Sequence, residues 1–128
     1  LEKIYAKEGI ECEIKSFFTD MDKKLAKANL VIARSGASTI AELIELKVPG
    51  ILIPLPSSAD NHQYYNAKEM TDKGAGWLVV ERANSASNLL KIVKSIGKDP
   101  TLLKKPIAQL KSMQQDSCQK MIDVIKKF

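Results

Sequence analysis

The sequence predicts an α/β fold of the Rossmann-like kind, in which a parallel sheet is covered by helices on both faces. Short apolar runs such as 30–33 and 50–55 alternate with helical segments of about ten residues. These runs are continuous, as is typical of strands buried on both faces, and their alternation with helices is typical of a parallel sheet. The 128 residues are about the size of one domain. We therefore expect a single domain over 1–128, ending in a helical C-terminal extension at 100–128.

The first half of the chain contains three of the predicted strands. In order, its predicted elements are the end of a helix at 1–7, a strand at 11–17, a helix at 20–28, a strand at 30–33, a helix at 38–47 and a strand at 50–55. Alternating polar and apolar residues predict the strand at 11–17. Met21, Leu25 and Ala28 have the spacing of one helix face.

The second half of the chain is mostly helical in pattern. Its predicted elements are a loop at 57–61, a helix at 62–73, a strand at 76–80, a helix at 85–96 and a helical segment at 100–128. Gly74 and Gly97 are the predicted helix ends. We expect the last helix to be interrupted near Pro106, because proline removes a helical hydrogen bond, and again near Asp116.

Composition narrows the classes of partner. Lysine and arginine residues exceed aspartate and glutamate residues by five, and this positive charge favours anionic partners. Nucleic acid is the least favoured of these, because Arg34 and Arg82 are the only arginines and basic residues do not alternate with aromatic ones. Cys12 and Cys118 form no CxxC motif, and His62 is the single histidine. We therefore expect no metal site and no cofactor.

Polar loops follow three of the predicted strands, at 17–20, 34–39 and 54–62. The carboxyl ends of parallel strands meet at one edge of a sheet, and ligands of open α/β sheets bind there. The sequence therefore predicts a ligand site at this edge.

The turn at 35–39 has two interpretations. The start of a helix can bind an anion such as phosphate, with Gly36 permitting close approach or a positive φ. Alternatively, Thr39 and Glu42 fit the T-x-x-E capping box, and the polar residues only cap the helix. Neither the P-loop motif nor the dinucleotide-binding GxGxxG motif is present.

The segment 60–66 (DNHQYYN) is rich in hydrogen-bonding side chains. It is either a binding loop or a solvated first helical turn capped by Asp60 or Asn61. His62 is a possible general base, but no serine or cysteine nucleophile with a suitable signature accompanies it.

Lysines are frequent near the C-terminus. They either contact an anionic membrane or only solvate a helix. These lysines are Lys104, Lys105, Lys111, Lys120, Lys126 and Lys127.

Four segments in this order, SFFTDM, RSGASTIAEL, VPGILIPLP and DNHQYYNA, resemble the C-terminal half of the MurG family. These bacterial glycosyltransferases have the two-domain GT-B architecture and transfer GlcNAc from UDP-GlcNAc to lipid I in peptidoglycan synthesis. The specific similarity runs from about Lys15 to Val80.

The resemblance implies a nucleotide site. Phe18 matches the residue whose backbone contacts the uracil edge. Ala37, Ser38 and Thr39 match the helix start that faces the diphosphate. Glu42 matches the carboxylate that binds the ribose hydroxyls.

The resemblance also implies a sugar site. His62 and Gln63 match the pair that contacts GlcNAc, with His62 standing where some members have glutamine. Arg34, Ser35 and Gly36 match the turn from strand to helix that sets this geometry.

The chain starts without methionine, directly in a helical pattern. We expect a fragment that lacks the family's N-terminal acceptor domain and the first strand of the donor domain. The resemblance then implies a UDP-GlcNAc-binding half with no catalytic residue and no metal ligand of its own, inactive in isolation. Lipid I would be bound by the missing domain, at the inner membrane surface on the cytoplasmic face of the plasma membrane.

Two alternatives remain open at the level of sequence. One is a related GT-B transferase with another lipid acceptor. The other is a non-catalytic, nucleotide-sugar-binding subunit of a split transferase.

Overall fold

The computed structural model describes Gly9 and residues 19–126. The helix end predicted at 1–7, the strand predicted at 11–17 and the candidate residue Phe18 lie outside these residues. The elements are α2 (Met21–Lys27), β1 (Val31–Ala33), α3 (Ala37–Leu46), β2 (Gly50–Leu52), η1 (Ala59–Asn61), α4 (His62–Asp72), β3 (Gly76–Leu78), α5 (Ser85–Lys98), η2 (Pro100–Leu103) and α6 (Lys104–Lys126).

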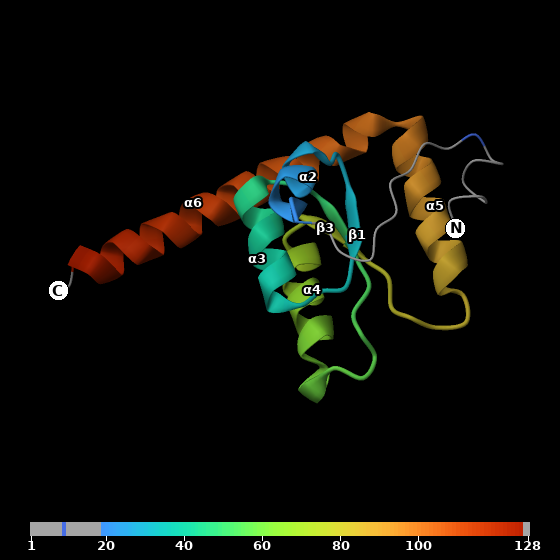
Figure 1. The fold of residues 1–128 in the computed structure, drawn as a ribbon, viewed down its shortest axis with the longest axis horizontal. Coiled ribbons are helices and arrows are strands. Elements are labelled where there is room, and N and C mark those ends of the chain that lie inside the picture. Colours follow the sequence, from blue (N-terminus) through green and yellow to red (C-terminus); the bar gives the residue numbers. More distant parts are fainter. Residues whose placement is uncertain (1–8, 10–18, 127–128) are drawn as a thin grey trace.

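The described strands form a parallel sheet in the order β1-β2-β3. Ile51 in β2 pairs with Ile32 on one side and Trp77 on the other. Helices α3 and α4 lie on one side of the sheet and α5 on the other (Figure 1). Ile32 and Leu89 of α5 line the same hollow on that second side. The predicted α/β class, with helices on both faces, is confirmed.

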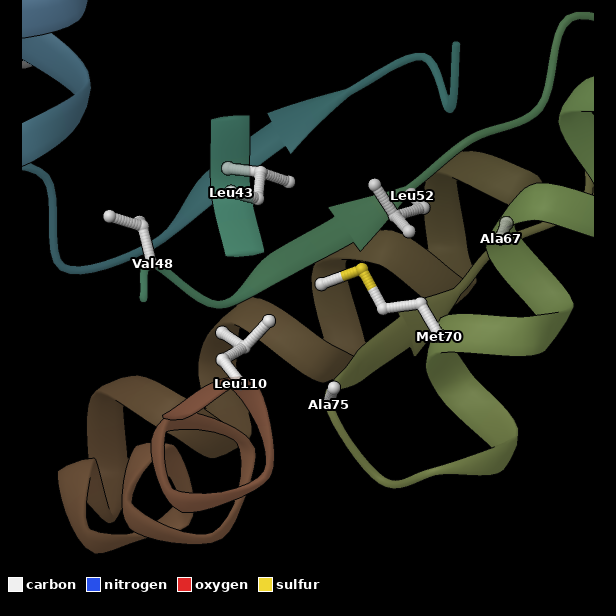
Figure 2. Close-up of a cluster of buried hydrophobic side chains, with 7 residues drawn as sticks. All are labelled: Leu43, Val48, Leu52, Ala67, Met70, Ala75 and Leu110. Atoms are coloured by element: carbon white, nitrogen blue, oxygen red, sulfur yellow. The ribbon is translucent and has the colours of Figure 1, made fainter. Parts of the chain in front are cut away.

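The core lies between the sheet and helices α3, α4 and α6 (Figure 2). It is a cluster of seven buried apolar residues: Leu43, Val48, Leu52, Ala67, Met70, Ala75 and Leu110. Leu110 belongs to α6, which packs against α3. The first half of the C-terminal helix therefore contributes to the domain core, while its second half projects away from the sheet (Figure 1).

Three predictions of where a helix ends or breaks are wrong: the end at Gly97 and the interruptions near Pro106 and Asp116. Helix α5 continues through Gly97 to Lys98, and α6 runs without interruption from Lys104 to Lys126. Pro106 is the third residue of α6. In the first turn of a helix the missing proline N–H costs no intrahelical hydrogen bond. Asp116 is an exposed residue in mid-helix and causes no break.

Candidate functional site at the carboxyl edge of the sheet

Three loops meet at the carboxyl edge of the described sheet. They are residues 34–36 after β1, 53–58 after β2 and 79–84 after β3. The first two were predicted from sequence, and the parallel topology places them together as expected. The third was missed, although Glu81 and Arg82 follow an apolar strand just as Arg34 does. Of the loop predicted at 17–20, Thr19 and Asp20 are among the described residues.

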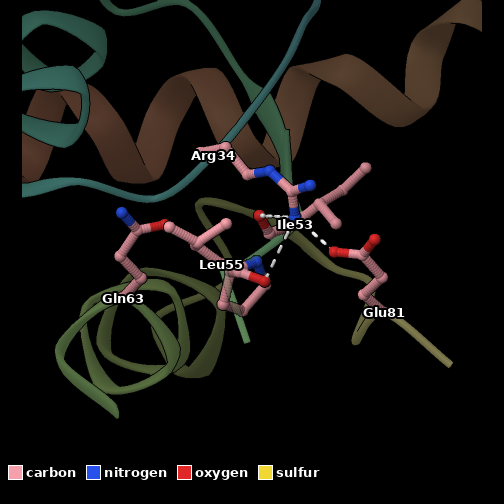
Figure 3. Close-up of polar contacts among 6 residues, drawn as sticks. Arg34, Ile53, Leu55, Gln63 and Glu81 are labelled. Atoms are coloured by element: carbon pink, nitrogen blue, oxygen red, sulfur yellow. Dashed lines mark hydrogen bonds and ion pairs between the residues drawn. The ribbon is translucent and has the colours of Figure 1, made fainter. Parts of the chain in front are cut away.

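Arg34 connects all three loops. Its Nη1 lies 2.6 Å from Glu81 Oε2 and 3.4 Å from the carbonyl oxygens of Ile53 and Pro54 (Figure 3). The side chains of Arg34 and Glu81 are 47% and 45% exposed, so solvent screens their attraction. Arg34, a candidate from sequence, therefore links the ends of the three strands.

Ser35 and Gln63 join the starts of α3 and α4. Ser35 is fully buried, and its hydroxyl donates a hydrogen bond to the Gln63 carbonyl oxygen over 2.6 Å. The side-chain amide of Asn66 donates to the Ser35 carbonyl oxygen over 3.3 Å. Asn66 lies in a segment that the sequence marked as polar, but this contact, 31 residues away in the chain, had no local signal.

Helix α3 starts without a side-chain cap. Its N-cap is Gly36, with φ −65° and ψ 153°, and no side chain bonds to its first amides. The capping-box prediction is wrong because the helix begins at Ala37, which makes Thr39 its third residue rather than its cap. The predicted alternative of a positive φ at Gly36 is also wrong.

The amides of Ala37, Ser38 and Thr39 precede the first hydrogen bond within α3, which Ile40 N donates to Gly36 O over 3.1 Å. Such amides, at the positive end of the helix dipole, are suited to an anion. The nearest atom to a methyl group built on Gly36 would be Gln63 Nε2, 4.0 Å away. The glycine thus keeps the space beside these amides open.

Glu42 is exposed and lies one turn further along α3. With Ser38 it lines a hollow of about 510 Å³ between α2 and α3, which Asp22 and Glu45 also border. Carboxylates accept hydrogen bonds from hydroxyl groups and repel phosphate. The two ends of this face therefore suit different parts of a ligand, an anion at the helix start and a polyol beside Glu42.

His62 is the first residue of α4 and is exposed. Within residues 19–126 its side chain forms no hydrogen bond with another candidate residue. Adjacent residues on a helix point about 100° apart, so His62 and Gln63 do not present their side chains in the same direction. The prediction that Asp60 or Asn61 caps α4 is wrong, because neither side chain makes a capping bond and both have positive φ values, 51° and 56°.

In the described part of the chain, no three histidine, cysteine, aspartate or glutamate side chains are grouped as a metal site would require. None of the described helices combines the length and the apolar character that a membrane crossing demands.

Comparisons with known proteins identify relatives over nearly the whole chain. The model of the "Glycosyltransferase family 28 C-terminal domain" matches residues 1–122. A curated protein of Rickettsia felis is 40% identical over 127 residues, which are 99% of this chain and 35% of that protein. It is named UDP-N-acetylglucosamine--N-acetylmuramyl-(pentapeptide) pyrophosphoryl-undecaprenol N-acetylglucosamine transferase.

A Wolbachia pipientis protein of the same name is 48% identical over 89 residues, 70% of this chain and 26% of its own length. The chain thus spans about a third or less of the curated relatives it matches. The crystal structure of Acinetobacter baumannii MurG superimposes with a TM-score of 0.76 at 26% identity, over 99% of this chain and 39% of that one.

Proposed function

Because the chain belongs to the family of glycosyltransferase family 28 C-terminal domains, we propose that it is the donor-binding part of a transferase that moves GlcNAc from UDP-GlcNAc to lipid I, forming lipid II. The names of the relatives support this substrate pair, since they specify an N-acetylglucosamine transferase and an N-acetylmuramyl-(pentapeptide) pyrophosphoryl-undecaprenol. The resemblance of its motifs to the MurG family points the same way.

The uncapped start of α3 is the observation that carries this proposal. The amides of Ala37, Ser38 and Thr39 would bind the diphosphate, and Glu42 would accept hydrogen bonds from the ribose hydroxyls. Gln63, whose amide nitrogen is directed at Gly36, would contact the sugar. For His62 and for Phe18, at the uracil edge, the support is the family resemblance alone.

In the proposed reaction, an acceptor hydroxyl oxygen bonds to the anomeric carbon of GlcNAc as the bond from that carbon to the β-phosphate oxygen breaks. The proton of the hydroxyl passes to a base, and UDP departs with added negative charge. The α3 dipole and its free amides would stabilise that charge where it develops.

We place the acceptor lipid, the base and the contact with the inner membrane surface in the part of the transferase beyond this chain. A transferase needs the acceptor held near the anomeric carbon and a base within hydrogen-bond reach. The edge of the sheet described above supplies only the donor side of such a cleft. The working enzyme would then be peripheral, at the cytoplasmic face of the membrane.

Calorimetric titration of the purified chain tests the proposal. UDP and UDP-GlcNAc should bind more tightly than ADP and GDP, whereas equal or tighter binding of the purine nucleotides would overturn it. In a second assay, UDP release is followed with UDP-GlcNAc and a lipid I analogue. The 128-residue chain should give no turnover; turnover near that of a two-domain enzyme would contradict the assignment of the base to another domain.

A further inference from the structure

We infer that Ser35 is a positioning residue for the donor sugar, which it serves by fastening the first turn of α4 to the start of α3. This inference rests on the proposed function and adds to it a residue that touches neither the nucleotide nor the sugar. Ser35 immediately precedes Gly36, the N-cap of α3. A segment that is hydrogen-bonded to Ser35 is therefore kept in a fixed position relative to the proposed diphosphate site.

Ser35 makes two hydrogen bonds to the same turn of α4. Its hydroxyl donates to the carbonyl oxygen of Gln63 over 2.6 Å, and its carbonyl oxygen accepts from Asn66 Nδ2 over 3.3 Å. Gln63 and Asn66 are three residues apart, and residues so spaced lie on one face of a helix. Ser35 itself is fully buried and its partners are half-buried, so water has limited access to these bonds.

The side chain of Gln63 is oriented by a third contact. Its Oε1 accepts a hydrogen bond from the backbone N–H of Leu55 over 2.9 Å (Figure 3). With the oxygen engaged in this way, the Nε2 group is directed toward Gly36 and has only donors to offer. Gln63 therefore presents an N–H group beside the start of α3. A hydroxyl group of the sugar in UDP-GlcNAc would accept a hydrogen bond from it.

Together these contacts couple two parts of the proposed site. The α3 start would bind the diphosphate and Gln63 the sugar, and Ser35 sets the distance between them. Loosening α4 relative to α3 should weaken the contribution of the sugar to binding and leave the nucleotide's contribution in place. A serine that merely stabilises the fold would instead affect both ligands alike, through the fraction of folded protein.

Ser35→Ala removes the hydroxyl bond, and the test compares its affinities for UDP and UDP-GlcNAc by calorimetry at a temperature where the variant is folded. UDP-GlcNAc affinity should fall about tenfold, the order expected for one buried hydrogen bond, and UDP affinity less than about twofold. The exposed Ser112 of α6 offers a matched hydroxyl deletion; Ser112→Ala should leave both affinities unchanged. Hydrogen exchange should also be faster in Ser35→Ala at the amides that close the first turn of α4, such as those of Asn66 and Ala67.

If Ser35→Ala does not fold, Ser35→Cys keeps the side-chain shape, with a somewhat larger sulfur atom, and leaves a weaker donor. It should show the same selective loss at smaller size. Equal losses for UDP and UDP-GlcNAc in the folded variant, or no loss for either, would overturn the positioning role. A wild-type chain that binds UDP but gains nothing from the sugar would instead overturn the donor assignment, and this inference with it.

Discussion

The Arg34 guanidinium lies 2.6 Å from the Glu81 carboxylate, 47 residues further along the chain, and so spans the end of β2 that lies between them. The pair holds the loop after β1 against the loop after β3. Since both side chains are about half exposed, their attraction is modest and is screened by dissolved salt.

Glu81→Gln should therefore lower the free energy of unfolding by less than about 1 kcal/mol at low ionic strength. In 1 M salt the difference from wild type should shrink, because the Debye length falls to about 3 Å. Urea denaturation at both ionic strengths measures this. A difference that does not change with salt would mean that Glu81 acts through something other than its charge.

Glu42→Gln should weaken UDP binding by about 1–3 kcal/mol, the cost of losing hydrogen bonds to a charged group. Stability should not change, because Glu42 lies inside α3 and caps nothing. Glu45→Gln is the matched control, an exposed carboxylate on the same helix and hollow. If Glu42→Gln binds UDP as tightly as Glu45→Gln does, or if Glu42→Gln has a lower melting temperature but an unchanged affinity for UDP, Glu42 is not a ribose ligand.

Gly76→Ala should destabilise the fold by about 1–3 kcal/mol through overpacking. Gly76 stands opposite Gly50 in the β2–β3 pair, and a methyl group there would lie 2.6 Å from the Gly50 carbonyl oxygen. Gly97→Ala is the control, since nothing lies within 4 Å of a methyl group at that helical position. It should stabilise by about 0.5–1 kcal/mol, and thermal melting that ranks the two variants in the opposite order would refute the packing at Gly76.

Lys47→Gly should stabilise the domain by roughly 1 kcal/mol. Lys47 ends α3 in the left-handed region with φ 56°, and Val48 N bonds to Leu43 O over 3.1 Å, as in a Schellman motif. That conformation costs a residue with a side chain about 1–2 kcal/mol, and glycine avoids this cost. The greater conformational entropy of glycine in the unfolded chain offsets part of the gain. Lys73→Gly is the control at the end of α4, where φ is −82°; an equal gain there would show that the lysine conformation is not the cause.

Much of the fold and part of the site could be predicted from sequence. The continuous apolar runs identified β1, β2 and β3, and the rule that parallel strands share a carboxyl edge placed 34–39 and 54–62 together. The membership of the family followed from four motifs in order. These signals are local or periodic, so each can be seen within a short window of the chain.

The remainder depends on contacts between distant residues or on which of two local patterns prevails. The bonds from Ser35 to Gln63 and from Arg34 to Glu81 span 28 and 47 residues, and no spacing rule predicts them. At α3, the T-x-x-E pattern favoured Thr39 as the cap, but Gly36 is the N-cap and the helix begins at Ala37. At Pro106 the general rule of helix breaking predicts an interruption, but α6 begins at Lys104, so the proline falls in the first turn, where it is tolerated.

Amide NMR during a UDP titration tests whether the start of α3 receives the diphosphate of the donor. The largest chemical-shift changes should fall on the amides of Ala37, Ser38 and Thr39, with a lesser set at the start of α4. Saturable shifts centred elsewhere, on α5 or along α6, with residues 37–39 unmoved, would contradict that placement of the diphosphate.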